Sequence, residues 1–328
     1  MSRKESRNAR LVQKWNYLGF AAGAGLLAFL MFFSDASWQG FLDALARTSF
    51  PFLMLLALFQ GLIITLAAMK WRIVIAQTSS AEKNVPLGPA ISATATGVLI
   101  GQVISIQVGV PVARIWVAKK FGLNAKAATG SSLYEQALDL LTLVFAALAS
   151  ILATFLNASI LLLSLLACLL MPVAVLTLPI ISAPCTALLN RFDPPPYLDG
   201  VRRIVVESLS AIARQDTGAL MWLAALSLVR YILITIVNVW IVVSLLPEVD
   251  WLTLTSSIPL ILLAMSLPFL PAGLGLTEIT LGGILVLQGV DPARAVEVAL
   301  AARVVLISGF ILSYPFLILM GQDFSSRK

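Results

Sequence analysis

The sequence predicts an all-α polytopic membrane protein with about six full spans and two Gly/Pro-broken re-entrant helical hairpins in an inverted-topology repeat. Three observations lead to this fold class. Of the 328 residues, 59% are apolar and only 12% are charged, which is roughly half the charged share of a soluble domain. The apolar residues also form segments of membrane-spanning length, and two of these segments contain clustered Gly and Pro. This composition excludes a soluble globule, a disordered chain and a secreted disulfide scaffold.

Six segments qualify as spans, because a span needs about 20 mostly apolar residues. They cover residues 15–33, 50–70, 127–155, 159–183, 219–246 and 295–320. The first follows a basic start, so the alternative there is a signal peptide. The small residues at 34–37 make a poor cleavage site and the apolar run is long for a signal core, so we interpret this segment as a span.

Two further apolar regions, residues 87–113 and 252–290, are interrupted by Gly and Pro. Such breaks free backbone groups that lipid cannot satisfy, so they occur where the backbone faces protein or water. We interpret both regions as re-entrant hairpins of half-helices, although the distribution of charge would be the same if both hairpins crossed the bilayer fully. The predicted turn residues are Gly109, Pro111, Pro271, Gly273 and Gly275.

The clusters of basic residues all fall on one side of this topology. The first 14 residues hold Arg3, Lys4, Arg7, Arg10 and Lys14. Lys70 and Arg72 mark the predicted inner end of the second span, and the predicted inner loop at 184–216 is also basic. Within that loop, residues 201–214 could form an interfacial amphipathic helix. By the positive-inside rule, we expect both termini in the cytoplasm. Our working hypothesis for the membrane itself is the inner membrane of a prokaryote.

We interpret residues 1–328 as a single membrane domain. Two stretches of it have the same order of elements. Residues 50–155 and 219–320 each give a span, a broken hairpin and a span, in opposite orientations. Residues 15–49 supply the first span and an outer loop, and residues 156–218 connect the two repeats. Paired broken segments in an inverted repeat indicate a transport site near the bilayer midplane. The alternative is that two broken segments recur by chance.

Ionisable residues inside spans are costly and are therefore candidates for function. Six such residues lie in the predicted spans or beside the breaks: Arg114, Glu135, Asp139, Arg230, Glu278 and Arg303. Glu135 and Asp139 are four residues apart and share a helix face. Two interpretations stay open. The charges form structural ion pairs that lock the bundle, or they line a polar cavity for a charged headgroup, for which Arg is well suited.

The sequence offers little for catalysis. It contains no His, and Cys168 and Cys185 lack the spacing of a metal site. The Gly spacing matches no phosphate-binding loop, and the folded part has no basic stripe for nucleic acid. We therefore expect no enzyme activity, no metal, no cofactor and no nucleic-acid partner.

Three stretches carry a family resemblance. Residues 70–72 read Lys-Trp-Arg at the end of an early span. A Gly/Pro stretch ends at Arg114 and is followed by the acidic pair within residues 135–139. Residues 271–278 read Pro-Ala-Gly-Leu-Gly-Leu-Thr-Glu, with Arg303 downstream. Together these motifs resemble the lysylphosphatidylglycerol synthase transmembrane family, also described as flippase-like.

The resemblance implies lipid translocation, or a membrane role in envelope-lipid or glycolipid synthesis. The sequence departs from the family pattern at Gln136 and Thr277, where the family usually has Arg, and at Ala272, where it has Gly. The two lost charges argue against a polyanionic ligand and leave a less charged one, such as a glycolipid or an isoprenoid lipid. The family's synthase activity resides in a soluble domain not found in these residues, so we do not expect aminoacyl transfer.

The leading hypothesis is therefore translocation of a membrane lipid or lipid-linked headgroup. The three arginines would attract the headgroup, and the three carboxylates would balance those charges. One alternative is a non-transporting partner of a lipid-modifying or glycosyl-transferring enzyme, docked through residues 184–216. Another is an ion-coupled small-solute transporter. A homo-oligomer is compatible with each of these hypotheses.

Overall fold

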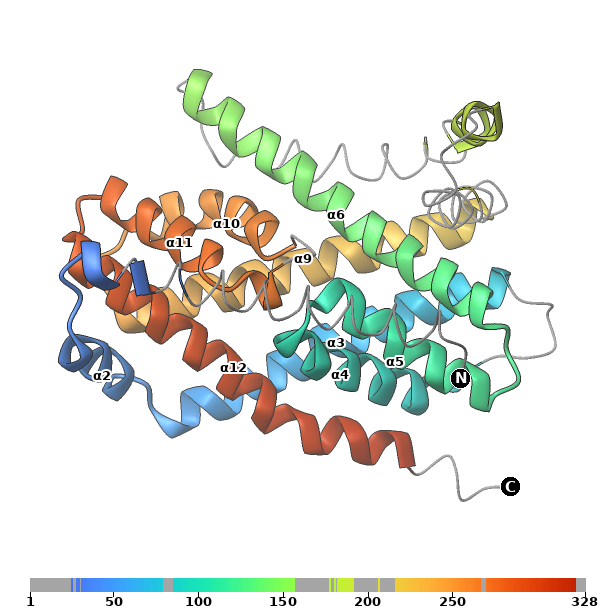
Figure 1. The fold of residues 1–328 in the computed structure, drawn as a ribbon, viewed down its shortest axis with the longest axis horizontal. Helices are drawn as coiled ribbons and strands as arrows, with labels where there is room; N and C mark the ends of the chain where they lie inside the picture. Colours follow the sequence, from blue (N-terminus) through green and yellow to red (C-terminus); the bar gives the residue numbers. More distant parts are fainter. Residues whose placement is uncertain are drawn as a thin grey trace, which may run out of the picture. The chain divides into compact units, whose positions relative to one another are not determined.

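The structure, a computed structural model, describes residues 31–78, 85–156, 182–191, 216–266 and 270–322, with single positions at 25, 28, 29, 177, 180 and 206. Within these ranges the chain is helical apart from turns and short connections, and no strand occurs there (Figure 1). Several predictions fall wholly or largely outside the described residues: the spans at 15–33 and 159–183, the basic N-terminus, and most of the loop at 184–216 with its amphipathic helix.

Four long helices correspond to the predicted spans at 50–70, 127–155, 219–246 and 295–320. They are α3 (Phe50–Thr78), α6 (Ala125–Leu156), α9 (Thr217–Leu245) and α12 (Pro292–Gln322) (Figure 1). Each is long and apolar enough to cross a bilayer. The all-helical prediction is therefore confirmed for the described part of the chain, and these four helices support a polytopic membrane protein.

Helix α3 continues past its predicted end at Lys70. The side chains of Trp71, Val74 and Ile75 on the following turns are completely buried, as is Lys70 itself. Burial of the Lys70 ammonium is tolerated because two carboxylates of α6 pair with it. Lys70 is thus buried inside the helix bundle and α3 does not end there, whereas its place at the inner membrane boundary stays a prediction.

Each of the two predicted broken regions consists of two short helices. The first contains α4 (Leu87–Val103) and α5 (Ile106–Lys120), and the second contains α10 (Trp251–Met265) and α11 (Leu276–Leu287). The longest, α4, has 17 residues and is therefore about 25 Å long, less than the ~30 Å of a bilayer core. The break in each region is real, and a re-entrant path stays a prediction.

The described chain falls into two compact units built from interleaved segments. Unit 1 comprises Met1–Gly61, Gly97–Gly109 and Ile234–Pro315, and unit 2 comprises Leu62–Thr96, Val110–Leu233 and Phe316–Lys328. In unit 1, Trp240 of α9 makes edge-to-face contacts with Phe52 and Phe59 of α3. In unit 2, α3, α6 and α9 contribute the buried cluster of Val74, Tyr134, Leu138, Leu220, Leu223 and Ala224. The predicted division into repeats at 50–155 and 219–320 stays a prediction.

The prediction that Gly109 and Pro111 form the first turn is wrong, because both lie inside α5 and the helices break at residues 104–105. Gly109 instead lies at a close helix contact, where an added Cβ would be 2.7 Å from the backbone nitrogen of Gly101. Small residues allow membrane helices to approach closely in this way. Pro111 removes one hydrogen bond to the carbonyl of residue 107, a loss that transmembrane helices tolerate.

The second break has the residues that the sequence predicted for it. Pro271–Gly273 form a single 3₁₀ turn, η1. Gly273 and Gly275 have φ of 71° and 85°, in the left-handed region that favours glycine. Ala272 also has a positive φ, 45°, which is uncommon for a residue with a Cβ. The chain therefore changes direction sharply between α10 and α11.

One helix, α2 (Trp38–Ala46), lies where only an outer loop was expected. The Ser37 hydroxyl caps it by accepting a hydrogen bond from the Gly40 N–H. Ser37 in turn donates from its own N–H and hydroxyl to Glu297 of α12, at 2.8 and 3.0 Å. Only Phe41 and Ala44 of its nine residues are buried. An apolar stripe this short gives no recognisable periodicity in the sequence, so the helix was not predicted.

Candidate functional site

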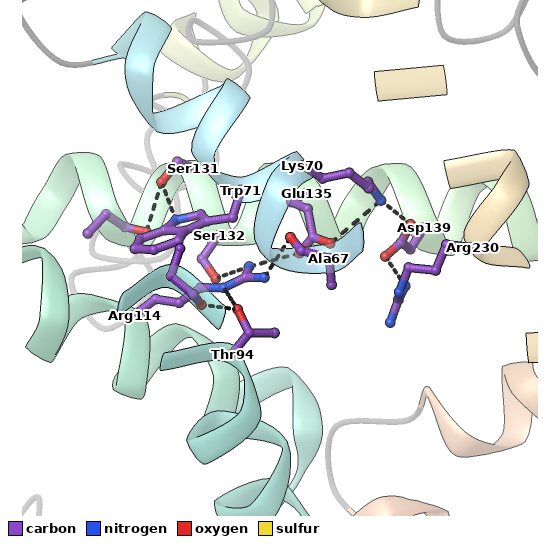
Figure 2. A network of polar contacts seen from close by, with 12 residues as sticks. Ala67, Lys70, Trp71, Thr94, Arg114, Ser131, Ser132, Glu135, Asp139 and Arg230 are labelled. Carbon is purple, nitrogen blue, oxygen red and sulfur yellow. Dashed lines mark hydrogen bonds and ion pairs between the residues drawn. The ribbon is translucent and has the colours of Figure 1, made fainter. Parts of the chain in front are cut away.

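Unit 2 contains five ionisable side chains in one network (Figure 2). They come from four helices: Lys70 from α3, Arg114 from α5, Glu135 and Asp139 from α6, and Arg230 from α9. The two carboxylates are one helical turn apart, so they lie on the same side of α6. The Lys70 ammonium forms an ion pair with Asp139 and is 3.5 Å from Glu135 Oε1. It therefore connects the two acidic residues.

Arg114 is completely enclosed by protein. Its guanidinium donates to Glu135 Oε2 (2.8 Å), Ser132 Oγ (3.1 Å), the Ala67 carbonyl (3.1 Å) and Thr94 Oγ1 (3.2 Å). Its central carbon is 5.2 Å from the centre of the Trp71 ring, within range of a cation–π interaction. These contacts occupy all three guanidinium nitrogens of Arg114. Its role in this structure is to hold α3, α4, α5 and α6 together.

The other end of the network is more open. Arg230 Nη1 donates to Asp139 Oδ2, and the two side chains are 24% and 21% exposed. The Arg114 and Glu135 side chains are only 0% and 3% exposed. Arg230 Nε is buried and has no hydrogen-bond partner within the described part of the chain. The network thus has a closed end at Arg114 and an accessible end at Arg230.

Unit 1 contains a separate, smaller cluster at the break between α10 and α11. Arg303 of α12 forms an ion pair with Glu278 of α11 and donates from Nη2 to the Ala272 carbonyl at 3.1 Å. The other Glu278 oxygen accepts from the Gly275 N–H at 2.7 Å. A carboxylate at this position satisfies a free N–H of the first helical turn and complements the helix dipole. Arg303 therefore holds both the strained turn and the start of α11 against α12.

The six predicted site residues are distributed over these two clusters. Arg114, Glu135, Asp139 and Arg230 lie together in unit 2, and Glu278 and Arg303 lie together in unit 1. Of the predicted turn residues, Pro271, Gly273 and Gly275 lie in the break beside Glu278, whereas Gly109 and Pro111 lie in α5.

Sequence reasoning missed Lys70 as a site residue. The apolar run Ile73-Val74-Ile75-Ala76 directly after it is a signal that the helix continues and that Lys70 is internal. The Thr94 and Ser132 hydroxyls that bind Arg114 had no comparable signal, because Ser and Thr are common in membrane helices and singly indicate little.

A match to a known protein family includes both clusters. Residues 16–313 match the family described as the lysylphosphatidylglycerol synthase TM region. No curated protein and no solved structure matches the chain. The matched residues cover most of the sequence and include the three motifs on which the resemblance rested. The chain therefore belongs to the lysylphosphatidylglycerol synthase TM region family.

Proposed function

We propose that this protein moves a lipid across the cytoplasmic membrane of a prokaryote, with its termini in the cytoplasm. The headgroup contacts buried charges at the broken-helix pairs, while the acyl chains stay in the bilayer. A polar route of this kind lowers the cost of taking a headgroup through hydrocarbon. Translocation breaks no covalent bond, so the proposal includes no catalytic residue and no cofactor.

The observation that carries this proposal is the pairing of buried ionisable groups at both broken-helix pairs. Charged side chains in membrane helices are expensive and mark pathways for polar substrates. Arg114 and Glu135 are fully enclosed, and we assign them a structural role. Asp139, Arg230 and Arg303 keep 21%, 24% and 16% of their side chains exposed. We assign these three residues to contact with the headgroup.

The short helices support a re-entrant arrangement within the same proposal. Helices α4, α5, α10 and α11 have 17, 15, 15 and 12 residues, and none of these lengths suits a full crossing. Broken helices in corresponding halves of a membrane protein are typical of inverted-repeat transporters. We propose that the two helix pairs are the re-entrant hairpins of such a repeat.

Lipid movement in proteoliposomes tests the proposal. The purified protein is reconstituted with tail-labelled fluorescent phospholipid or glycolipid, and dithionite then bleaches the label in the outer leaflet. We expect the wild-type protein to move inner-leaflet lipid to the outer leaflet, so that dithionite also bleaches the label that was protected. In vesicles with the Arg303→Leu variant the inner-leaflet label should stay protected from dithionite, because that variant loses the cation that pairs with Glu278.

Arg294→Leu is the matched control. Arg294 is also on α12 and forms an ion pair with Glu248, but both side chains are about half exposed, 44% and 52%. The control should move lipid like the wild type. A folded Arg303→Leu variant with the wild-type rate would contradict the assignment of Arg303. If wild-type vesicles keep as much protected label as protein-free vesicles for every lipid tried, lipid translocation itself is contradicted.

A further inference from the structure

The short helix α2 is attached to unit 1 at both of its ends. At its start, the Ser37 N–H and hydroxyl donate to Glu297 of α12, and Gly40 lies so close to the same carboxylate that an added Cβ would overlap it. Just after its end, Arg47 Nη1 donates at 2.9 Å to the carbonyl of Leu245, the last residue of α9. Helix α2 therefore has a defined orientation against α9 and α12.

The ends of three helices of membrane-spanning length lie beside α2. Helix α3 begins at Phe50, shortly after Arg47, while α9 ends at Leu245 and α12 begins at Pro292, shortly before Glu297. The nine residues of α2 make a helix about 14 Å long, less than half of the ~30 Å that a full crossing requires. A helix this short, at the ends of three spans, is expected along the surface of the bilayer.

The exposed surface of α2 divides into an apolar side and a polar side. Trp38 and Leu42 are four residues apart and share one side of the helix, where they are 65% and 40% exposed. Gln39 and Asp43 share the next side, about 100° further around the helix. Both are exposed, and the Gln39 amide donates to Asp43 Oδ1 at 3.0 Å. The remaining face of α2 is buried against unit 1.

The apolar side of α2 is close in the chain to a surface that lipid covers. Phe50 is the first residue of the spanning helix α3 and is 67% exposed. Trp251 begins α10, shortly after the end of α9, and is 59% exposed. Exposed Trp side chains at the ends of spans are typical of the membrane interface, where the ring meets acyl chains and the N–H meets headgroups and water. Trp38 is in a position of the same kind.

We infer that α2 is an interfacial helix. Its side with Trp38 and Leu42 binds the boundary between headgroups and acyl chains of one leaflet, and its side with Gln39 and Asp43 faces water. Amphipathic helices of this kind bury their apolar side about 5–10 Å into that boundary. Because α2 is bonded to α9 and α12, the contact fixes the depth of this end of unit 1 in the bilayer. The inference requires that α3, α9 and α12 span the membrane, and it does not depend on lipid translocation.

Nitroxide labels on adjacent residues of α2 test the inference. In the full chain with Cys168 and Cys185 replaced by Ser, Leu42→Cys and Asp43→Cys are labelled separately and reconstituted in phosphatidylcholine vesicles. Molecular oxygen concentrates in the hydrocarbon, whereas a water-soluble nickel chelate stays outside it. We expect the ratio of oxygen accessibility to nickel accessibility to be at least threefold higher at Leu42 than at Asp43. Phe50→Cys gives the reference ratio for a position that lipid covers.

Trp38→Cys and Gln39→Cys repeat the comparison one turn earlier, again at exposed positions that the packed face of α2 does not need. Equal ratios within both pairs, or a lower ratio at Leu42 than at Asp43, would overturn the inference. A Leu42 label that neither reagent reaches would show that protein, such as a second copy of the chain, covers this side, and would overturn it as well. Vesicles that also contain phosphatidylglycerol should give the same ratios, because the apolar side carries no charge. Ratios that change with the charge of the headgroups would contradict a contact made by apolar burial.

Discussion

Arg114 and Arg230 belong to the same network, but their surroundings differ. Arg114 directs its guanidinium to four oxygen atoms of the protein. Among the described residues, Arg230 has one partner, and its buried Nε has none. The sequence left structural ion pairs and headgroup binding as equal alternatives for these residues. We propose, from the difference in burial and hydrogen bonding, that Arg114 has the structural role and Arg230 contacts the headgroup. No property of an isolated Arg in a sequence supports such a division.

The structural assignment of Arg114 makes a prediction about stability. Glu135→Gln removes the carboxylate 2.8 Å from Arg114 and leaves that cation poorly compensated. Breaking a buried pair from one side costs about 3–5 kcal/mol, so the unfolding temperature in detergent should fall markedly. Glu248→Gln, which breaks the exposed pair with Arg294, should cost no more than about 1 kcal/mol. Equal unfolding temperatures of the two variants would contradict the role given to Arg114.

At the scale of the elements, the sequence predicted that two regions are broken but located only one of the breaks. The turn at residues 271–275 contains a Pro and two glycines with positive φ, and the Glu278 carboxylate caps the helix that follows. These neighbouring residues define the turn. In the first region the break at 104–105 has no Gly or Pro of its own. Gly109 was misread as a turn because a sequence cannot distinguish a glycine needed for φ from one needed for close packing.

The packing role of Gly109 is directly testable. In Gly109→Ala, the new Cβ would lie 2.7 Å from the Gly101 nitrogen, so α4 and α5 would be forced apart and the unfolding temperature should fall. Gly130→Ala is the matched control, because Gly130 is also inside a helix, α6, with no atom within 4 Å of its added Cβ. That variant should be neutral or stabilised by up to about 1 kcal/mol, the helix propensity gain of Ala over Gly. A Gly109→Ala variant as stable as Gly130→Ala would contradict the close contact.

At the scale of the whole molecule, composition and span length were sufficient to predict an all-helical membrane protein, because burial in lipid imposes a length and an apolarity that are visible in sequence. Three motifs carried the family resemblance, and they contain every residue of the two charge clusters except Arg230. Lys70 was placed at a boundary because the positive-inside rule treats every Lys near a span end alike. The burial of its ammonium, which that rule does not predict, depends on Glu135 and Asp139, about 65 residues further along the chain.

The proposed orientation predicts opposite accessibility for two exposed positions. In a chain with Cys168 and Cys185 replaced by Ser, Lys126→Cys at the start of α6 should lie in the cytoplasm. Pro247→Cys, in the turn after α9, should lie outside. A membrane-impermeant maleimide added to intact cells should therefore label only Pro247→Cys, and permeabilisation should be needed for Lys126→Cys. Labelling of both positions from the same side would contradict the topology.

Transbilayer movement of a tail-labelled phospholipid by the wild-type protein, measured while the number of protein molecules per vesicle is varied, tests the central claim most directly. If the protein translocates lipid, every vesicle with at least one active copy should lose its dithionite-protected label. The fraction of vesicles that lose this label should therefore rise with protein dose in parallel with the fraction that contains at least one copy. The Arg303→Leu protein, reconstituted at the same doses, should leave the label protected. If the protected fraction stays at the protein-free value across the whole range of wild-type doses, the account of lipid translocation through these charge clusters is wrong.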